Sequence, residues 1–329
     1  MNTNLSKYLS LISLVSLLFL NSCGEDEKPI ATGNNDPSNI YNLASNNSQL
    51  TMFIEAIDKV GLESTFSDLS NLTVFTPSNA VFSAYLADLG YSDIDDWLTV
   101  VDNNEVKKMI LYHVLGEEFQ SDDLVTGYLK TLATNSDNKN IDLFINSGSG
   151  VNINGQTIGV LEADIEASNG TIHIIDGVLQ APTISDLIQA NPDFSDLIAA
   201  GNFSSGDFFG TLHQETSMFS LLLPNNGAFN QYYASQSNIN NISEMMNELG
   251  TDSLGNILKY HILLGNQRSV QFSTQAYSTR LTGKKVNIIN SGGNLSITDG
   301  QARQAFFLFK DISALNGSIH IISNVLLPN

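Results

Sequence analysis

The residues in this chain that are best suited to chemistry are its five histidines, and four of them form two matched pairs. His113 and His173 recur as His261 and His320, which follow them by 148 and 147 residues. An imidazole can act as a general acid or base, or it can bind a metal ion. His213 has no counterpart, so we expect it at the surface.

The residues around these histidines do not complete a catalytic or metal site. The sequence has no G-x-S-x-G, no H-E-x-x-H and no phosphate-binding glycine loop,. The oxygen-rich segments "SDIDD" (92–96) and "SDNKNID" (136–142) lack the spacing of a calcium loop,. His113 and His173 could meet in the fold, but two histidines without a third ligand make a poor catalytic centre. We therefore predict no enzyme activity, no cofactor and no metal site.

The surroundings of the histidines indicate a structural role instead. In "TIHII" the strand alternation places Ile172 and Ile174 on one face and His173 on the other,. His113 falls on the apolar stripe of a helix predicted at 104–115,. A buried imidazole must find hydrogen bonds, because an unpaired polar group in a core costs stability. We interpret these residues as core histidines.

The same spacing relates other motifs along the chain, which indicates a duplicated domain. "TVFTPSNAVF" (73–82) matches "SLLLPNNGAF" (220–229), and "ASNGTIHII" matches "LNGSIHII". The matched residues, each 147 positions apart, are Pro77 with Pro224, Asn169 with Asn316 and Gly170 with Gly317. A repeat of this length can bury its own core. We predict two domains, at 40–182 and 183–329.

Each repeat begins with helices and ends with strands. In the first we expect helices at 48–62, 78–90 and 104–115 and a strand at 71–77, with strands and turns from residue 141 onward,. Helices followed by antiparallel strands indicate an α+β fold. Asn-Gly suits a tight turn with positive φ, so each pair should reverse the chain just before a central strand.

Composition restricts the partners. The chain has 14 basic and 34 acidic residues, a net charge of −20, and a hydrophobic content of 42%. The hydrophobic content indicates a folded protein. The negative charge repels phosphate backbones and anionic lipid surfaces, so we expect no nucleic-acid partner.

The N-terminus has the pattern of an export signal. Lys7 precedes an apolar run at 9–20, which is too short to span a bilayer and fits a secretory signal,. The single cysteine, Cys23, follows directly after "LNS" and cannot form an internal disulfide. "LNSC" resembles a bacterial lipoprotein signal, which implies cleavage after residues 1–22 and lipidation of Cys23. The alternative, an incidental cysteine within a cleaved peptide, is less favoured.

The residues after Cys23 predict the location of the protein. "GEDEK" (24–28) resembles the acidic signal that sends lipoproteins of the Bacteroidota to the outer face of the outer membrane. Residues 23–39 are rich in Pro, Gly, Asn and charge, which indicates a flexible tether,. We expect an outer-membrane lipoprotein displayed on the cell surface, with the periplasmic face as the alternative. Membrane contact would be through the lipid anchor only.

Three ordered motifs resemble the fasciclin domain family. They are "TVFTPSNAVF", "LYHVLG" and "ASNGTIHIIDGVLQAP", and the second unit repeats them as "LLLPNNGAF", "KYHILLG" and "LNGSIHIISNVLLP". The resemblance implies two tandem fasciclin-like domains, each a wedge with a twisted, β-sandwich-like core and helices packed around it. It also implies a role in adhesion outside the cell, with an extracellular protein or glycan as the partner.

The resemblance also supplies candidate contacts. Adhesive sequences in animal members end in Asp-Ile just before the second homology segment, and the Tyr-His motif is also linked to adhesion. The matching residues here are Asp164, Ile165, Asp311, Ile312, Tyr112 and Tyr260. The alternative is that each Asp-Ile pair is a turn and packing element. For the whole protein, the alternatives to adhesion are a structural envelope spacer and, less favoured, an extracytoplasmic hydrolase. "DSL" (252–254) resembles a short O-glycosylation motif with Ser253 as acceptor.

Overall fold

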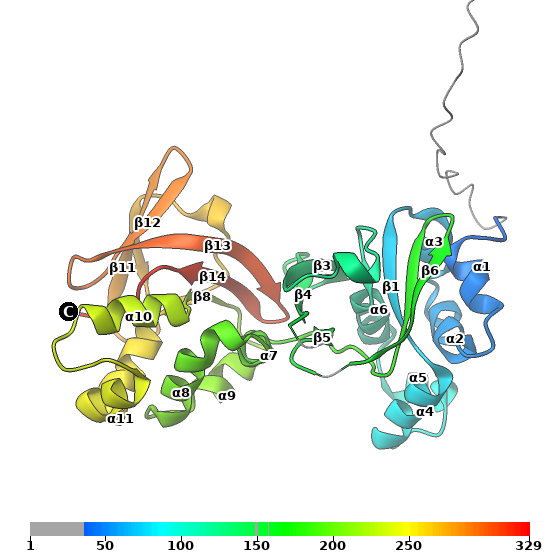
Figure 1. Ribbon diagram of the computed structural model, residues 1–329, viewed down its shortest axis with the longest axis horizontal. Coiled ribbons are helices and arrows are strands. Elements are labelled where there is room, and N and C mark those ends of the chain that lie inside the picture. Colours follow the sequence, from blue (N-terminus) through cyan, green and yellow to red (C-terminus); the bar gives the residue numbers. More distant parts are fainter. Residues whose placement is uncertain (1–35, 149–150, 157) are drawn as a thin grey trace, which may run out of the picture.

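The computed structural model describes residues 36–148, 151–156 and 158–329. The predicted signal peptide, Cys23 and the tether up to residue 35 lie outside the described residues. The described chain forms two units, which lie next to each other along the long axis (Figure 1). Each unit contains a seven-stranded sheet with helices packed against it. The predicted α+β class and the tandem arrangement are confirmed.

The elements of the two units follow the same order. The first unit contains α1 (Ile40–Ser45), α2 (Thr51–Val60), α3 (Glu63–Asp68), β1 (Leu72–Pro77), α4 (Asn79–Asp88), α5 (Ile94–Val100), α6 (Asn103–Tyr112), β2 (Val114–Leu115), β3 (Gly127–Thr134), β4 (Asn140–Asn146), β5 (Asn152–Ile153), β6 (Val160–Ala167) and β7 (Gly170–Ile175). The second contains α7 (Ile184–Ala190), α8 (Ser195–Phe203), α9 (Phe208–His213), β8 (Phe219–Pro224), α10 (Asn226–Ala234), α11 (Ile242–Tyr260), β9 (Ile262–Leu264), β10 (Gln275–Ser278), β11 (Lys285–Ser291), β12 (Asn294–Thr298), β13 (Gln304–Ala314) and β14 (Gly317–Ile322).

Local signals explain where the helices begin and end. Helix α2 stops at Gly61, whose φ of 69° is easy for glycine,. Helix α4 begins after Ser78, which caps the N–H of Val81,. Helix α6 was predicted to reach residue 115, but it ends at Tyr112, and His113 is its C-cap. The two residues that follow leave the helix because they pair with β1 as strand β2.

Each sheet is mixed and not purely antiparallel as predicted. In the first unit the strand order is β5-β4-β3-β2-β1-β7-β6, and β1 runs parallel to β7 with Leu72 opposite Gly170 and Pro77 opposite Ile175. The second unit repeats the parallel pair with β8 and β14, where Pro224 ends β8. Its strand order is β10-β11-β12-β13-β14-β8-β9, because β12 pairs with β13 there. The long chain between β1 and β7 permits the parallel pairing.

The Asn-Gly pairs hold the start of this central strand. Gly170 has φ 153°, and a Cβ there would overlap the carbonyl oxygen of Leu72. The Asn169 side chain accepts the N–H of Ile40 at 2.8 Å and donates to the carbonyl of Phe66 at 2.9 Å. Asn316 and Gly317 repeat these roles in the second unit. The predicted reversal before the strand is confirmed.

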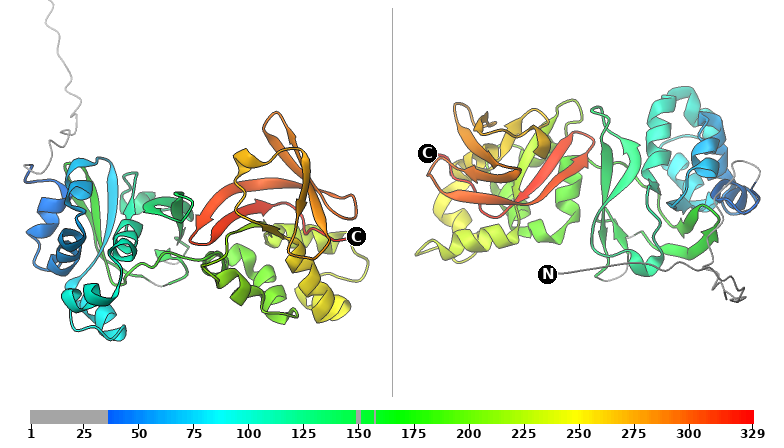
Figure 2. Two further views of the ribbon diagram at one scale, coloured as in Figure 1. Left: turned by 180° about the vertical axis from the view of Figure 1, so that it is seen from behind. Right: turned by 90° about the horizontal axis from the view of Figure 1, so that it is seen from above.

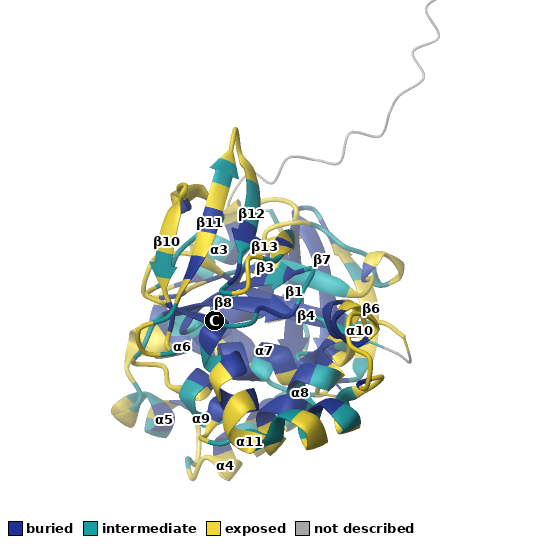
Figure 3. Ribbon diagram, turned by 90° about the vertical axis from the view of Figure 1, so that its left-hand side faces the viewer, coloured by how far each residue is buried: buried dark blue, intermediate teal, exposed yellow. Residues whose placement is uncertain are grey.

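The curled sheet separates two hydrophobic clusters, and its central strands are buried (Figure 3). Ile172 and Ile174 face the cluster beneath the helices, which contains Phe53 and Phe82. The opposite face of β7 joins the second cluster, which lies inside the curl and contains Phe75, Tyr112, Leu143 and Ile175. The predicted division of the "TIHII" strand is confirmed.

The two units lie side by side (Figure 2) and share a packed interface. Phe144 on β4 is buried in the hydrophobic cluster of the second unit, which includes Ile184 and Ile312. The Tyr128 ring on β3 lies 6.2 Å from that of Phe309 on β13. The chain passes between the units at residue 182 and enters α7, capped by Thr183. The first unit therefore presents the outer face of β3 and β4 to β13 and α7 of the second.

The described end of the predicted tether belongs to the first unit. The carbonyl of Ser38 accepts the N–H of Ser168 at 3.0 Å, and Asn39 caps α1. The Asp36 carboxylate accepts a hydrogen bond from the Ser168 hydroxyl. The boundary predicted at residue 40 therefore moves back to include 36–39, because these residues fix the β6–β7 turn.

Candidate functional site

The helix-end histidines, His113 and His261, hold the segments that follow the last strands. The Nδ1–H of His113 donates to the carbonyl of Met109 at 2.8 Å, and its Nε2 accepts the N–H of Leu179 at 2.9 Å. His261 makes the same two bonds, to Ile257 and Leu326. Burial lowers the pKa of both histidines to about 4,. They are neutral structural groups, as predicted.

The strand histidines hold the backbone of the Asp-Ile pairs. His173 donates from Nε2 to the carbonyl of Phe119 at 3.1 Å, and its Nδ1 accepts the N–H of Asp164 at 3.2 Å. His320 likewise bonds the carbonyl of Gln267 at 2.9 Å and the N–H of Asp311 at 3.3 Å. Each repeated motif therefore fixes an aspartate on the neighbouring strand.

That aspartate lies at an irregularity in the strand. The ladder between β6 and β7 shifts register between Glu162 and Ile165, and Asp164 has φ 59°. In the second unit the shift falls between Phe309 and Ile312, and Asp311 has φ 67°. Such a bulge re-aims the side chains of an edge strand, and aspartate tolerates positive φ better than most residues.

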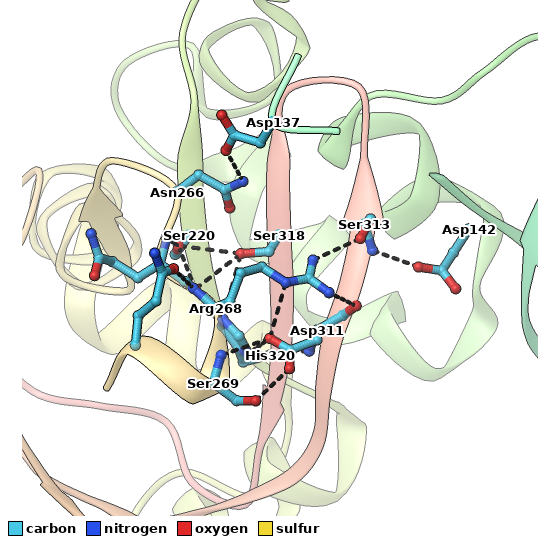
Figure 4. Close-up of polar contacts among 12 residues, drawn as sticks. Asp137, Asp142, Ser220, Asn266, Arg268, Ser269, Asp311, Ser313, Ser318 and His320 are labelled. Atoms are coloured by element: carbon cyan, nitrogen blue, oxygen red, sulfur yellow. Dashed lines mark hydrogen bonds and ion pairs between the residues drawn. The ribbon is translucent and has the colours of Figure 1, made fainter. Parts of the chain in front are cut away.

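The aspartate carboxylates also bond to a short helical turn. Asp164 accepts the N–H of Ser121 at 2.7 Å and its hydroxyl at 2.6 Å. Asp311 accepts the N–H of Ser269 at 2.8 Å and the hydroxyl of the same residue (Figure 4). These bonds lower the pKa of Asp164,. The Asp-Ile pairs are therefore packing elements in both units, which was the alternative interpretation.

The two strands that carry these aspartates, β6 and β13, differ in what covers their outward edges. In the second unit Arg268 lies 3.4 Å from the Asp311 carboxylate, and it donates to the Ser313 hydroxyl at 2.7 Å and the Asp311 carbonyl at 3.0 Å (Figure 4). The first unit has Gln120 at the matching position, and Gln120 donates instead to Thr171 at 2.9 Å.

As a result, the aspartate of the first unit is the more exposed of the two. The Asp164 side chain is 39% exposed, against 25% for Asp311. Glu162 and Glu166, on the same strand, are exposed as well. Strand β6 is the last strand of its sheet. We call its outward side, with Glu162, Asp164 and Glu166, the open edge.

Three of the other candidate contacts are wrong because they are buried. Tyr112 donates to the carbonyl of Asp142 at 3.1 Å, and Tyr260 donates to that of Lys285 at 2.7 Å. Both tyrosines support their sheets from inside. Ile312 is buried in the core of the second unit, and Ile165 is half-buried. A partner of the folded chain therefore has access chiefly to Asp164.

The buried histidines are committed to structural hydrogen bonds. In the described ranges no group of three His, Cys, Asp or Glu residues could hold a metal ion. Both ring nitrogens of each buried histidine are already bonded to the chain. His213 is 64% exposed, as predicted. Ser253 is exposed on α11. Over the described residues, no helix has the length and apolar character to cross a membrane.

Arg268 and Glu166, which make the two edges unequal, were missed by sequence reasoning. The signal was available in the repeat, since Arg268 aligns with Gln120 when the histidine motifs are superposed. A charged residue in only one of two repeats marks a place where their surroundings differ.

The fold and its repeated motifs define a tandem α+β protein of the fasciclin type. The fasciclin domain family matches residues 48–181 and 192–328, and the chain belongs to this family.

Its relatives include proteins of animals. The transforming growth factor-beta-induced protein ig-h3 of Sus scrofa is 27% identical over 263 residues, covering 79% of this chain and 35% of that protein. Periostin of Homo sapiens is 28% identical over 261 residues, covering 79% and 28%. The chain thus spans about a third of the length of these relatives. A solved FAS1 domain pair from the insect cell adhesion molecule fasciclin I has a TM-score of 0.48 and 18% identity, covering 87% of this chain and 95% of that one.

Proposed function

We propose that this chain is a lipid-anchored, non-catalytic adhesion protein of the cell surface. It binds an extracellular protein or glycan through the open edge of the first unit. The observation that carries this proposal is the difference between the two edges, since Arg268 and the first unit cover the Asp311 edge. The matching Asp164 edge has no such cover among the described residues.

The chemistry of the open edge supports binding. An edge strand presents backbone N–H and C=O groups that an extended segment of a partner can pair with. Glu162 and Glu166 add two exposed carboxylates to that of Asp164, which also accepts from Ser121, and together they would favour a partner that carries basic or hydroxyl groups,. The bulge held by His173 gives the edge a fixed shape, so binding would cost little ordering entropy.

A structural spacer is the second candidate, and the packed interface between the units favours it. Phe144 and Tyr128 fix one unit against the other, which would give a fixed length between an anchor and the far end. A spacer needs the interface and not the open edge. Variants of the interface and variants of the open edge therefore distinguish the two functions.

The binding proposal is tested with beads coated with residues 24–329, which include every element and contact described above. The beads are offered to cells, matrix proteins and a glycan array. Asp164→Asn combined with Glu166→Gln should weaken adhesion at least about tenfold, because charged groups at a contact are worth a few kcal/mol. The matched control, Asp311→Asn with Ser313→Ala, alters the covered edge and should retain binding. Equal binding by both variants would remove the open edge as the contact surface.

The anchoring part of the proposal rests on Cys23 and the apolar run before it. Cys23→Ala should abolish metabolic acyl labelling and release the protein from the membrane fraction. Protease added to whole cells should digest the wild-type protein if it is displayed outside. Digestion only after the outer membrane is opened would place it on the periplasmic face.

A further inference from the structure

The contact between the two units uses one surface of each, and each unit carries the counterpart of both surfaces. Inside the chain the outer face of β3 and β4 contacts the edge of β13. The matching face of the second unit is that of β10 and β11, and the matching edge of the first unit is the open edge on β6. The two lie at opposite ends of the molecule (Figure 1).

The buried tyrosines show which residues of the two faces correspond. Tyr112 donates to the carbonyl of Asp142, and Tyr260 donates to that of Lys285, so Lys285 takes the place of Asp142. Asp142 is buried at the interface, whereas Lys285 is exposed. Figure 3 looks onto this end of the second unit and shows β10 and β11 largely exposed.

The strand pairing shows which residues of the two edges, on β6 and β13, correspond. Glu166 pairs with Thr171 on β7, and Ser313 pairs with Ser318 on β14. The N–H of Ser313 points away from β14 and donates to Asp142 across the interface at 2.7 Å. The N–H of Glu166 therefore points away from β7 in the same way, and its side chain is exposed.

The outer face of β10 and β11 in the second unit, which we call the free face, and the open edge carry opposite charges. A groove beside the free face is lined by Arg280, Lys284 and Lys285. These are three of the chain's 14 basic residues, gathered at one end of a strongly acidic protein. The open edge at the other end carries Glu162, Asp164 and Glu166. If two copies met at these ends in the way that the two units meet inside the chain, Lys285 of one copy would lie next to Glu166 of the other.

We propose that copies of this chain associate head to tail by repeating their internal contact, with the β10–β11 face of one copy on the open edge of the next. Lys285 then pairs with Glu166, in the positions that Asp142 and Ser313 occupy within the chain. A contact between two different surfaces does not close on a two-fold axis, so it generates either a ring or an open row of molecules. The inference deepens the proposed function, because it names a second copy as a partner of the same edge.

The test is sedimentation velocity of residues 24–329 over a range of concentrations. At low salt the average mass should rise with concentration, and salt at about 0.5 M should return it toward the monomer, because screening shortens to a few ångströms. Lys285→Glu and Glu166→Lys should each weaken association about tenfold or more, because each brings like charges together. An equimolar mixture of the two variants should restore association, because every mixed contact again joins opposite charges.

Lys107→Glu and Glu55→Lys make the same charge changes on helices α6 and α2, away from both surfaces, and should leave association unchanged. Circular dichroism confirms that each variant is folded. A monomer at every concentration overturns the inference, as does association that the charge reversals do not alter or that the mixture does not restore. Beads that bind an external ligand while the protein stays monomeric would leave the proposed function standing. If the protein associates with itself but binds no external ligand, external binding is refuted and the head-to-tail association stands.

Discussion

The carboxylate of Asp142 in the first unit accepts a hydrogen bond from the backbone N–H of Ser313 in the second, 2.7 Å away. Asp142 is almost fully buried, and the Nζ of Lys130 lies 3.1 Å from the same carboxylate. Burial raises the pKa of this carboxyl group, because the charged form loses its hydration,. A buried charge contributes to stability only while its partners remain, so this contact makes the two units depend on each other.

Replacing Asp142 should therefore weaken the contact between the units. In Asp142→Ala the N–H of Ser313 is left buried without an acceptor, which costs about 1–3 kcal/mol. Asp142→Asn keeps an acceptor oxygen and should lose less. Urea unfolding of the three proteins measures the difference. An Asp142→Ala protein as stable as the wild type would show that water replaces the carboxylate.

The hydrophobic part of the interface is tested by Phe144→Ala. Phe144 belongs to the first unit but is buried in the core of the second, and truncating a buried Phe costs about 3–5 kcal/mol,. We expect limited proteolysis to spare the wild-type connection near Pro182, which is itself buried. The variant should be cut there into two stable fragments. Rapid cleavage of the wild type at this point would show that the interface opens freely.

The tandem α+β fold could be predicted because the repeat shows its main motifs twice. Strands β2 and β3 were not predicted, because they lie before residue 141, where strands were expected to begin. The histidine, Asn-Gly and proline positions were matched between the repeats, and all of them occupy equivalent places in the two units. The parallel pairing of β1 and β7 was not predictable, because period-2 patterns do not reveal strand direction. The end of α6 was missed for a related reason, since Val114 suits a helix and a buried strand equally.

The site was harder to predict because it depends on the contact between the units. Asp164 and Asp311 occupy the same Asp-Ile motif, and the sequence difference that separates them, Gln120 against Arg268, lies far from the motif along the chain. Their exposure differs because Arg268 covers Asp311 within the second unit and Asp142 of the first unit bonds to the nearby Ser313, whereas Asp164 has neither neighbour. The tyrosines were misassigned because a Tyr-His motif at a helix end has the same spacing whether its ring faces inward or outward.

The strand histidines should be needed for stability. His173→Ala removes a buried ring and leaves the N–H of Asp164 and the carbonyl of Phe119 unpaired, at a cost of about 2–4 kcal/mol,. His213→Ala is the matched control, because its exposed side chain should change the free energy of unfolding by less than about 0.5 kcal/mol. Thermal and urea unfolding measure both. Equal effects of the two substitutions would contradict a core role for His173.

All four buried histidines should make the protein sensitive to acid. Burial lowers the pKa of His113, His261 and His320 to about 4, and it also lowers that of His173. An unfolded histidine titrates near a pKa of about 6.5, so below that pH the unfolded chain binds more protons than the native one. The histidines' contribution to the free energy of unfolding is therefore complete above about pH 6.5 and is lost as the pH falls toward 4.

The carboxylates do not mask this effect. The raised pKa of Asp142 acts in the opposite direction, but it is a single group. The lowered pKa values of Asp164 and Asp311 remove stability only at more acidic pH, below the usual value of 3.8. We expect the free energy of unfolding in urea to fall by several kcal/mol, on the order of one per histidine or more, between pH 7 and about 4.5. His320→Gln, which can still donate and accept but does not titrate there, should flatten the slope by about one proton. A free energy that stays constant over this range would show that the histidines are protonated equally in both states.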